Sequence, residues 1–371
     1  MGIKRDKPLY LMVQEGESFI WFVIEDGRQA RSISGSGSRS ISGSGSRSNA
    51  DDDDIIFRRI RLPQLPDRRF PYSLVVIDSK LYLMGGYKFI GEPRPISVRG
   101  YEVVNLEGGK RWHHEPLSKY VNPTEHLASC KDGLIYGLGR RPYILNPAGP
   151  VTTTDMPLSC DVEVPHTLAI SNKKIYAYSY PGRKGRILVR YDLEANKWDP
   201  FCVFFWGDCS IGVVLEQDSY LVTYGTRHPV KWENDKPGVW VFDIRRGEWL
   251  DEPVKGLDKA LPVIPHWDPG YEYLAYGYEY DLPRLYQVGN ERRLAMVWQE
   301  LASDDRVNIH DRVNIHCHKF TLQGPTTSGT FVAGQLSNKV ETLDGRTSKV
   351  IGLVACTVKV ETTERGRKDV E

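Results

Sequence analysis

The chain has 371 residues, 40% of them apolar, which is enough for two ordinary domains or for one large all-β domain with a buried core. Its 49 Lys and Arg nearly balance its 48 Asp and Glu, so net charge gives no reason to expect nucleic acid or an anionic membrane as a partner. The six cysteines stand singly in apolar stretches and no apolar run is long enough to span a membrane, so we expect buried free thiols in a cytoplasmic and/or nuclear protein.

The N-terminal part contains apolar runs that are typical of strands, at 9–13, 19–24 and 55–63. Ahead of the third run, residues 31–48 consist of the unit "RSISGSGS" in tandem with a trailing Arg-Ser, and "NADDDD" follows. Because such Gly- and Ser-rich sequence offers few apolar side chains to a core, we expect a disordered insertion over residues 28–54. At the other end we expect a flexible tail over residues 362–371.

Four hairpins follow along the chain, each made of two apolar runs around a turn, and they start at residues 73, 126, 166 and 210. A second element comes after each hairpin. In its clearest form it reads apolar-aromatic-Asp-apolar, a turn and then Trp, as in "RYDLEANKW" (190–198) and "VFDIRRGEW" (241–249). Four short strands in each unit of about 40 to 50 residues indicate a β-propeller. We expect the aromatic residue of the third strand and the Trp of the fourth to fill the wedge between adjacent blades.

The expected architecture is a single all-β domain over residues 1–371 with six four-stranded blades. These are the N-terminal strands, the four units above and a final unit within 261–340. The stretch 261–300 is ambiguous, so seven blades are an alternative. The N-terminal blade has only three strands of its own, so we expect a C-terminal strand from "KVIGLVACTVKVE" (349–361) to complete it and close the ring.

The segment "LYLMGGY" (81–87), with its diglycine Gly85-Gly86 and the downstream Trp112, resembles a kelch repeat. The chain is similar to plant kelch-repeat proteins of the galactose oxidase/kelch superfamily, in a plant family with degenerate repeats. The resemblance implies a kelch-type β-propeller. Propellers host both enzymes and interaction scaffolds, so the fold alone does not decide the function.

Two long polar segments join second and third strands of predicted units, at 88–100 and 225–238, and we expect such loops to gather on one face of the ring. Exposed aromatic and Arg side chains on a rigid support suit the binding of a peptide. The alternative is that the Trp of the second loop packs under its own loop. The candidate binding residues of the two loops and their flanks are Tyr87, Phe89, Arg94, Arg227 and Trp232.

The stretch "DRVNIHDRVNIHCHK" repeats one hexamer, at 305–310 and 311–316. On a strand, His316 and His318 would share one face, and two such imidazoles can bind zinc, copper or nickel if a third ligand joins them. The alternative is a tolerated duplication, because an insertion of six residues preserves the alternation of faces. In that case Val313, Ile315 and Cys317 lie on the buried face, and Asn314 and the two histidines face solvent or a neighbouring blade.

A second metal hypothesis concerns Glu300 and Asp304, which locally resemble the iron-type site of plant specifier proteins. The third position of that pattern is Asn308 here, where the resemblance would require His, so the site lacks a ligand. No set of residues for galactose oxidase chemistry can be assigned either. We therefore expect a monomeric, non-enzymatic scaffold that binds protein partners, with no cofactor and no catalytic residues. A metal-dependent enzyme, specifier-like or oxidase-like, is the alternative.

Overall fold

A computed structural model of the chain describes residues 8–15, 18–26, 55–65, 69–70, 73–77, 79–85, 87–88, 96–97, 100–106, 108–116, 128–131, 133–137, 143–148, 153–156, 166–171, 173–179, 186–205, 212–215, 219–225, 237–258, 261, 283–288, 292–302, 312–327, 329–344 and 355–357. The regular elements in these ranges are all strands. In the described part, no helix is long and apolar enough to cross a membrane. The predicted insertion over 28–54 and the predicted tail over 362–371 lie outside the described residues.

The described strands form six four-stranded sheets, numbered here in the order of their first strand around the ring. Sheet 1 contains β27 (Ala355–Thr357), β1 (Leu9–Glu15), β2 (Ser18–Asp26) and β3 (Ile55–Ile60). Sheet 2 contains β5 (Ser73–Ile77), β6 (Lys80–Met84), β9 (Gly100–Asn105) and β10 (His113–Pro116). Sheet 3 contains β11 (Ala128–Lys131), β12 (Leu134–Gly137), β13 (Tyr143–Leu145) and β14 (Thr153–Asp155).

The second half of the chain forms the other three four-stranded sheets in the same way. Sheet 4 contains β15 (His166–Ile170), β16 (Lys174–Ser179), β17 (Arg186–Asp192) and β18 (Lys197–Phe205). Sheet 5 contains β19 (Val213–Leu215), β20 (Tyr220–Gly225), β21 (Gly238–Asp243) and β22 (Glu248–Trp249). Sheet 6 contains β23 (Arg284–Gln287), β24 (Arg293–Ala302), β25 (Arg312–Gln323) and β26 (Val332–Asp344).

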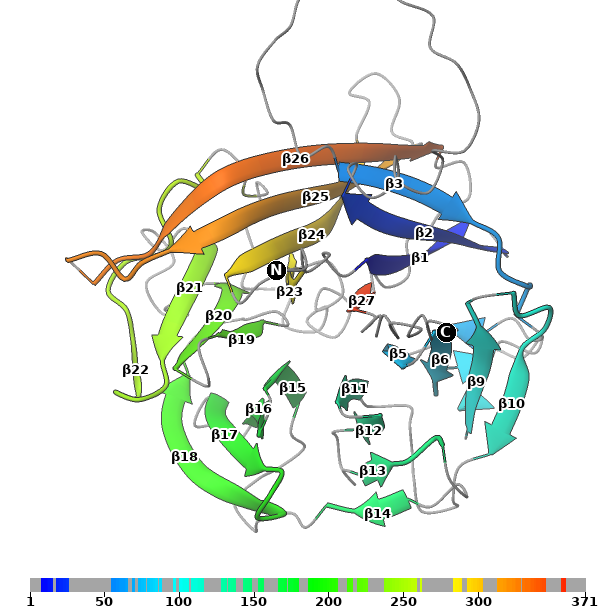
Figure 1. Cartoon of the computed structure of the whole chain (residues 1–371), viewed down its shortest axis with the longest axis horizontal. Helices are drawn as coiled ribbons and strands as arrows, with labels where there is room; N and C mark the ends of the chain where they lie inside the picture. Colours follow the sequence, from blue (N-terminus) through cyan, green and yellow to red (C-terminus); the bar gives the residue numbers. More distant parts are fainter. Residues whose placement is uncertain are drawn as a thin grey trace, which may run out of the picture.

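The sheets stand around a central axis as in a β-propeller (Figure 1). The inner strand of each sheet faces the centre of the ring; it is β27 in sheet 1 and the first strand in chain order in the other sheets. Each inner strand contacts the inner strand of the next sheet, and β23 of sheet 6 contacts β27 of sheet 1. β27 pairs antiparallel with β1, with Leu9 opposite Thr357 and Leu11 opposite Ala355. The prediction that a strand from 349–361 completes the N-terminal sheet is therefore confirmed.

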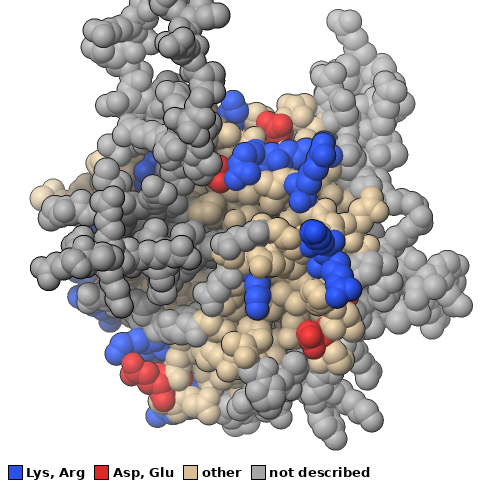
Figure 2. All heavy atoms as spheres, turned by 45° about the vertical axis from the view of Figure 1, so that its right-hand side comes forward, with Lys and Arg blue, Asp and Glu red and all other residues tan. Residues whose placement is uncertain are grey.

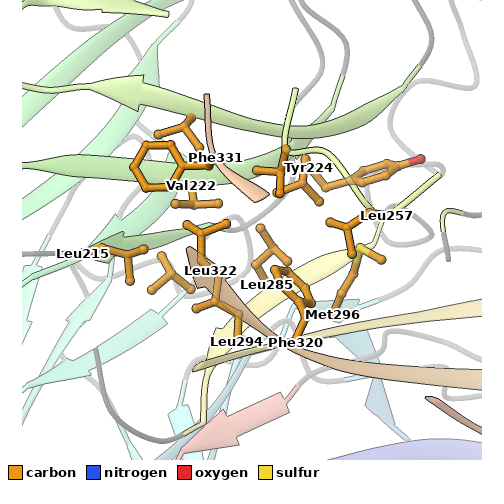
Figure 3. Close-up of a cluster of buried hydrophobic side chains, with 14 of the residues drawn as sticks. Leu215, Val222, Tyr224, Leu257, Leu285, Leu294, Met296, Phe320, Leu322 and Phe331 are labelled. Atoms are coloured by element: carbon orange, nitrogen blue, oxygen red, sulfur yellow. The ribbon is translucent and has the colours of Figure 1, made fainter. Parts of the chain in front are cut away.

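Buried apolar side chains hold the ring together, with one cluster between each pair of neighbouring sheets. The largest lies between sheets 5 and 6, where Tyr224 and Val222 of β20 meet Leu294 and Met296 of β24 and Phe320 of β25 (Figure 3). A four-stranded sheet exposes two faces, and its two neighbours cover them here. Burial of apolar surface between sheets is thus the main force that stabilises the ring.

The turns between third and fourth strands follow one design in sheets 4 and 5. In sheet 4, an oxygen of the Asp192 carboxylate accepts the N–H groups of Glu194 and Ala195 at 3.0 and 2.8 Å. The turn then passes through Asn196, whose φ of 52° lies in the left-handed region, before the chain enters β18. In sheet 5, Asp243 accepts the N–H groups of the residues two and three positions on, at 2.9 and 3.0 Å, and Gly247 adopts the left-handed conformation with a φ of 72°. The Asp and the Asn or Gly in the two sequence units are therefore turn residues.

A small three-stranded sheet modifies the prediction of an irregular loop at 88–100. Its strands are β4 (Arg69–Phe70), β7 (Tyr87–Lys88) and β8 (Ile96–Ser97), in the order β4-β7-β8. Two-residue strands carry no periodic signal, so the sequence could not reveal them. Part of the connection between β6 and β9 thus has its own backbone pairing, which ties it to the segment that precedes β5.

Candidate functional site

The two histidines singled out from the sequence lie in β25, the third strand of sheet 6. His316 stands opposite Trp298 of β24 and Val340 of β26, while His318 stands opposite Met296 and Asn338. Their side chains share one face of the sheet, as predicted, and this face looks towards sheet 5. Sheet 6 thus presents both imidazoles on the side of its neighbour.

On the other face of β25, the residues on either side of His316 are fully buried. Ile315 and Cys317 both have 0% exposure and pack in the cluster between sheets 6 and 1. The expectation of a buried face with Ile315 and Cys317 is confirmed, and Cys317 is a free thiol. The histidines therefore belong to the face that the alternative hypothesis assigned to solvent or to a neighbouring sheet.

Trp298 organises the imidazole pair. Its ring centroid lies 4.7 Å from that of His316 with the planes 5° apart, which is a stacked arrangement. It also lies 4.7 Å from that of His318, with an angle of 40° between the planes. The two imidazole centroids are 6.5 Å apart. Both histidines are therefore held against one indole.

The outer histidine also has a carboxylate partner. His316 Nε2 lies 3.0 Å from Glu300 Oε2, and the side chain of Glu300 is more exposed, at 59% against 16% for His316. Glu300 and His316 thus form a polar pair at the edge of the buried cluster. This carboxylate is the one that the resemblance to specifier proteins singled out.

The inner histidine has a different environment, because only 5% of it is exposed. Burial, and secondarily the nearby His316, lowers the pKa of His318 from 6.5 to about 4. Its Nδ1 atom is buried and has no hydrogen-bond partner among the described residues. His318 is therefore a neutral imidazole at neutral pH, held mainly by packing against Trp298.

A metal ion at this place would find two suitable donors in His316 and Glu300, and His318 is in the neutral form that metals require. Within the described residues, no three side chains of the His, Cys, Asp and Glu types come together as a metal site. Asp304 and the first copy of the duplicated hexamer, 305–310, lie outside the described residues, as does Asn308. The metal hypothesis for His316 and His318 stays a prediction.

The predicted peptide-binding loops lie almost wholly outside the described residues. Phe89, Arg94, Arg227 and Trp232 belong to undescribed stretches, and of Tyr87 only the backbone is described, as part of β7. The topology does place the two connections on one side of the ring, because each joins the second and third strands of an up-and-down sheet. Their role in binding therefore stays a prediction.

A basic surface that the sequence did not reveal spans sheets 1 and 2 (Figure 2). Its cations are exposed or partly exposed and form no ion pair with another described residue. They are Arg61, Lys80, Lys110 and Arg111. We call this set the basic surface.

Two hydrogen bonds bring these cations together from three separate segments of the chain. The indole Nε1 of Trp112 donates a hydrogen bond to the carbonyl oxygen of Pro63 at 2.8 Å, which joins the turn at 106–112 to the segment after β3. The turn at 79–80 is tied to the same region, because the N–H of Leu106 donates to the carbonyl oxygen of Ser79 at 2.8 Å. Residues 50 positions apart in sequence therefore share one surface.

Two acidic side chains of the same two sheets are already engaged. Glu25 pairs with Arg58 at 2.7 Å, and Glu102 pairs with His114 at 2.8 Å. These carboxylates are therefore not used to neutralise the basic surface. The exposed cations of this surface are therefore available to an anionic partner.

Comparison with known proteins identifies no family for the chain. No family model matches it, and no curated protein matches it. Among solved structures, one titled "Structure of YjhT" is 9% identical with a TM-score of 0.46, over 90% of this chain and 98% of that one. TolB from Acinetobacter baumannii is 10% identical with a TM-score of 0.44, over 95% of this chain and 67% of that one. Likeness at this level carries no argument, so the propeller assignment rests on the sheet order and strand pairing described above.

Proposed function

We propose that the chain is a non-enzymatic protein-interaction scaffold, built as a kelch-type propeller with one blade for each of its six four-stranded sheets. The resemblance of residues 81–87 and Trp112 to plant kelch repeats supports the kelch assignment. A rigid ring holds its surface side chains in fixed positions, which lowers the entropic cost of binding a partner. Such a scaffold would act in the cytoplasm and/or the nucleus.

The observation that carries this proposal is the basic surface. Four cations without an ion pair to another described residue, gathered from two neighbouring sheets, make an electrostatic site that folding itself does not require. Charges of this kind steer association and select partners more than they stabilise a fold. The loops with Tyr87, Arg94 and Trp232 would supply further contacts on the ring.

The chemistry of the partner follows from the balance of charge. The chain as a whole has 49 basic and 48 acidic residues, so its positive potential is local. Nucleic acids are bound through many phosphate contacts along an extended track, whereas a short acidic segment needs only a few cations. The basic surface therefore suits an acidic segment of a protein partner.

Peptide binding tests the proposal. A labelled peptide of alternating Glu and Ser should bind the wild type, and the same peptide with Gln in place of Glu should not. The variant Arg61→Glu/Arg111→Glu should weaken binding of the Glu peptide by about tenfold or more, because it places two repulsive charges in the site. A matched control is Lys197→Glu/Arg245→Glu, which changes two exposed cations on sheets 4 and 5.

Three outcomes would contradict the proposal. They are equal binding of the Glu and Gln peptides, an unchanged affinity of the Arg61→Glu/Arg111→Glu variant, and tighter binding of a single-stranded oligonucleotide than of the peptide. The first two would remove the electrostatic basis of the site. The third would replace a protein partner with a nucleic acid.

A second candidate function is a metal-dependent enzyme, which the contact between His316 and Glu300 favours. His316 and Glu300 offer two donor atoms 3.0 Å apart, next to the buried imidazole of His318 with its unpartnered Nδ1. A third ligand could complete a metal site there. Metal analysis of the purified protein tests this candidate. Stoichiometric zinc, copper or iron that is lost in His316→Ala or His318→Ala would favour the enzyme over the scaffold.

A further inference from the structure

The outermost strand of sheet 6, β26, is the longest strand of the described structure and forms one end of its sheet. It has 13 residues, whereas β22, the outermost strand of the neighbouring sheet 5, has two. β26 therefore extends well beyond the part of sheet 6 that β22 can cover. Figure 1 shows it along the periphery of the ring.

β26 carries the only large apolar side chains that are exposed in the described structure. Leu336 is 44% exposed and Val340 is 43% exposed. The two residues lie four positions apart on one strand, so both project from the same face with Asn338 between them. Single exposed apolar residues are common on proteins, but two of them aligned on one edge strand are typical of an interface.

No described strand covers the edge of β26 over most of its length. At its start, the N–H of Lys255 donates to the carbonyl oxygen of Phe331 at 3.0 Å, and the N–H of Ala333 donates to that of Lys255 at 2.8 Å, which covers the first residues. From residue 334 to residue 344, the edge that faces away from β25 pairs with no described strand. Such an edge offers backbone donors and acceptors to an added strand.

The sequence of this open edge is self-complementary about Asn338. If a second copy pairs antiparallel with Asn338 opposite its own counterpart, Leu336 falls opposite Val340 of the other copy, and Val340 falls opposite its Leu336. The four exposed apolar side chains then cover one another in cross-strand pairs. Lys339 falls opposite Ser337, and Glu341 falls opposite Gln335, so no like charges oppose each other.

We propose that β26 pairs antiparallel with β26 of a second copy of this chain, around a two-fold axis at Asn338, and joins sheet 6 of both copies into one continuous eight-stranded sheet. An isologous contact of this kind satisfies both edges at once. It involves few residues, so its size lies near the lower end of specific interfaces, below about 1,200 Å². We therefore expect a dimer that dissociates on dilution, in contrast to the monomer expected from the sequence.

Cysteine cross-linking tests the position of the axis. In the proposed register, two copies of residue 338 lie about 5 Å apart, so Asn338→Cys should form a disulfide-linked dimer under mild oxidation. The control is Thr342→Cys, an exposed position on the same strand, whose two copies would lie about 27 Å apart and should not cross-link. The wild type, oxidised in the same way, is the control for cross-links that form through the native cysteines.

The oligomeric state provides the second measurement. Light scattering coupled to gel filtration should show the wild type approach the dimer mass as its concentration rises. Leu336→Lys should raise the dissociation constant by about tenfold or more, because it places a charge opposite Val340. Thr342→Lys adds the same charge opposite Gly334 and should have little effect. A wild type that stays monomeric at all concentrations, or equal cross-linking at positions 338 and 342, would overturn the proposal.

Discussion

Tyr191 of β17 lies directly opposite Trp198 of β18, with their ring centroids 5.2 Å apart and their planes at 61°. Phe242 and Trp249 repeat this relationship in sheet 5, at 5.2 Å and 62°. The first pair packs in the cluster between sheets 3 and 4, and the second in the cluster between sheets 4 and 5. In these two units, the aromatic residue and the Trp thus fill the wedge between neighbouring sheets, as predicted.

Truncation of one of these tryptophans should destabilise the protein strongly. Trp198→Ala removes a side chain that is 9% exposed and leaves a cavity between two sheets. We expect a loss of about 3 kcal/mol in the free energy of unfolding, measured by urea denaturation. Lys197→Ala, at an exposed position next to it, should change the free energy by less than about 0.5 kcal/mol. A loss below about 1 kcal/mol for Trp198→Ala would mean that the wedge is not tightly packed.

Closure of the ring by β27 leads to a second prediction. Cys356 lies opposite Tyr10, in the middle of the three-residue pairing between β27 and β1. Cys356→Pro should lower the melting temperature by several degrees, because proline fits poorly in a strand and removes a backbone donor. Cys356→Val keeps the donor and is a good strand former, so it should melt close to the wild type. Equal melting of both variants would show that β27 does not help to close the ring.

The buried imidazole of His318 predicts a pH dependence of stability. Its pKa is about 4 in the folded protein and about 6.5 in an unfolded chain, so the unfolded chain binds more protons between these values. Stability linked to His318 is therefore complete above about pH 6.5 and is lost as the pH falls towards about 4. His318→Phe should lose less stability than the wild type between about pH 7 and pH 4.5. His113→Phe, at an exposed position, should behave as the wild type does, and a steeper loss in His318→Phe would refute this assignment.

The duplicated hexamer gives a fourth prediction. The second copy contributes residues 312–316 to β25, with Asn314 hydrogen-bonded to Thr342 at 2.9 Å. Deletion of 305–310 removes an even number of residues and leaves the second copy in place. The melting temperature of the deletion variant should stay close to that of the wild type. A fall of several degrees would mean that the first copy is part of the packed structure.

Much of the fold could be predicted because the repeated units carry strong local signals. The hairpins that start near 73, 126, 166 and 210 correspond to strand pairs β5-β6, β11-β12, β15-β16 and β19-β20. Alternating apolar residues, turn residues and a Trp at a fixed distance identify such units without knowledge of the fold. The closing strand could be predicted because a three-stranded N-terminal sheet needs a fourth strand.

The outer strand of sheet 6 could not be predicted in the same way. Most of β26 faces solvent, and it contains Ser337, Asn338, Lys339 and Glu341 among few apolar residues. Its strand conformation comes from pairing with β25, which a local pattern does not reveal. The edge proposed to bind a second copy is therefore visible only in the structure.

The basic surface was hidden from the sequence for a different reason. Arg61, Lys80 and Arg111 come from three segments that are joined by backbone and indole hydrogen bonds. A balanced net charge gives no hint of such a local excess. The histidine pair, by contrast, could be placed on one strand face from its spacing alone.

The most direct test of the scaffold assignment is quantitative affinity capture from cells that make the protein. The comparison uses the wild type, Arg61→Glu/Arg111→Glu and Lys197→Glu/Arg245→Glu. The scaffold assignment predicts a defined set of proteins with acidic segments, captured by the wild type and the control variant and lost from the variant of the basic surface. Capture that is identical for all three proteins would contradict it.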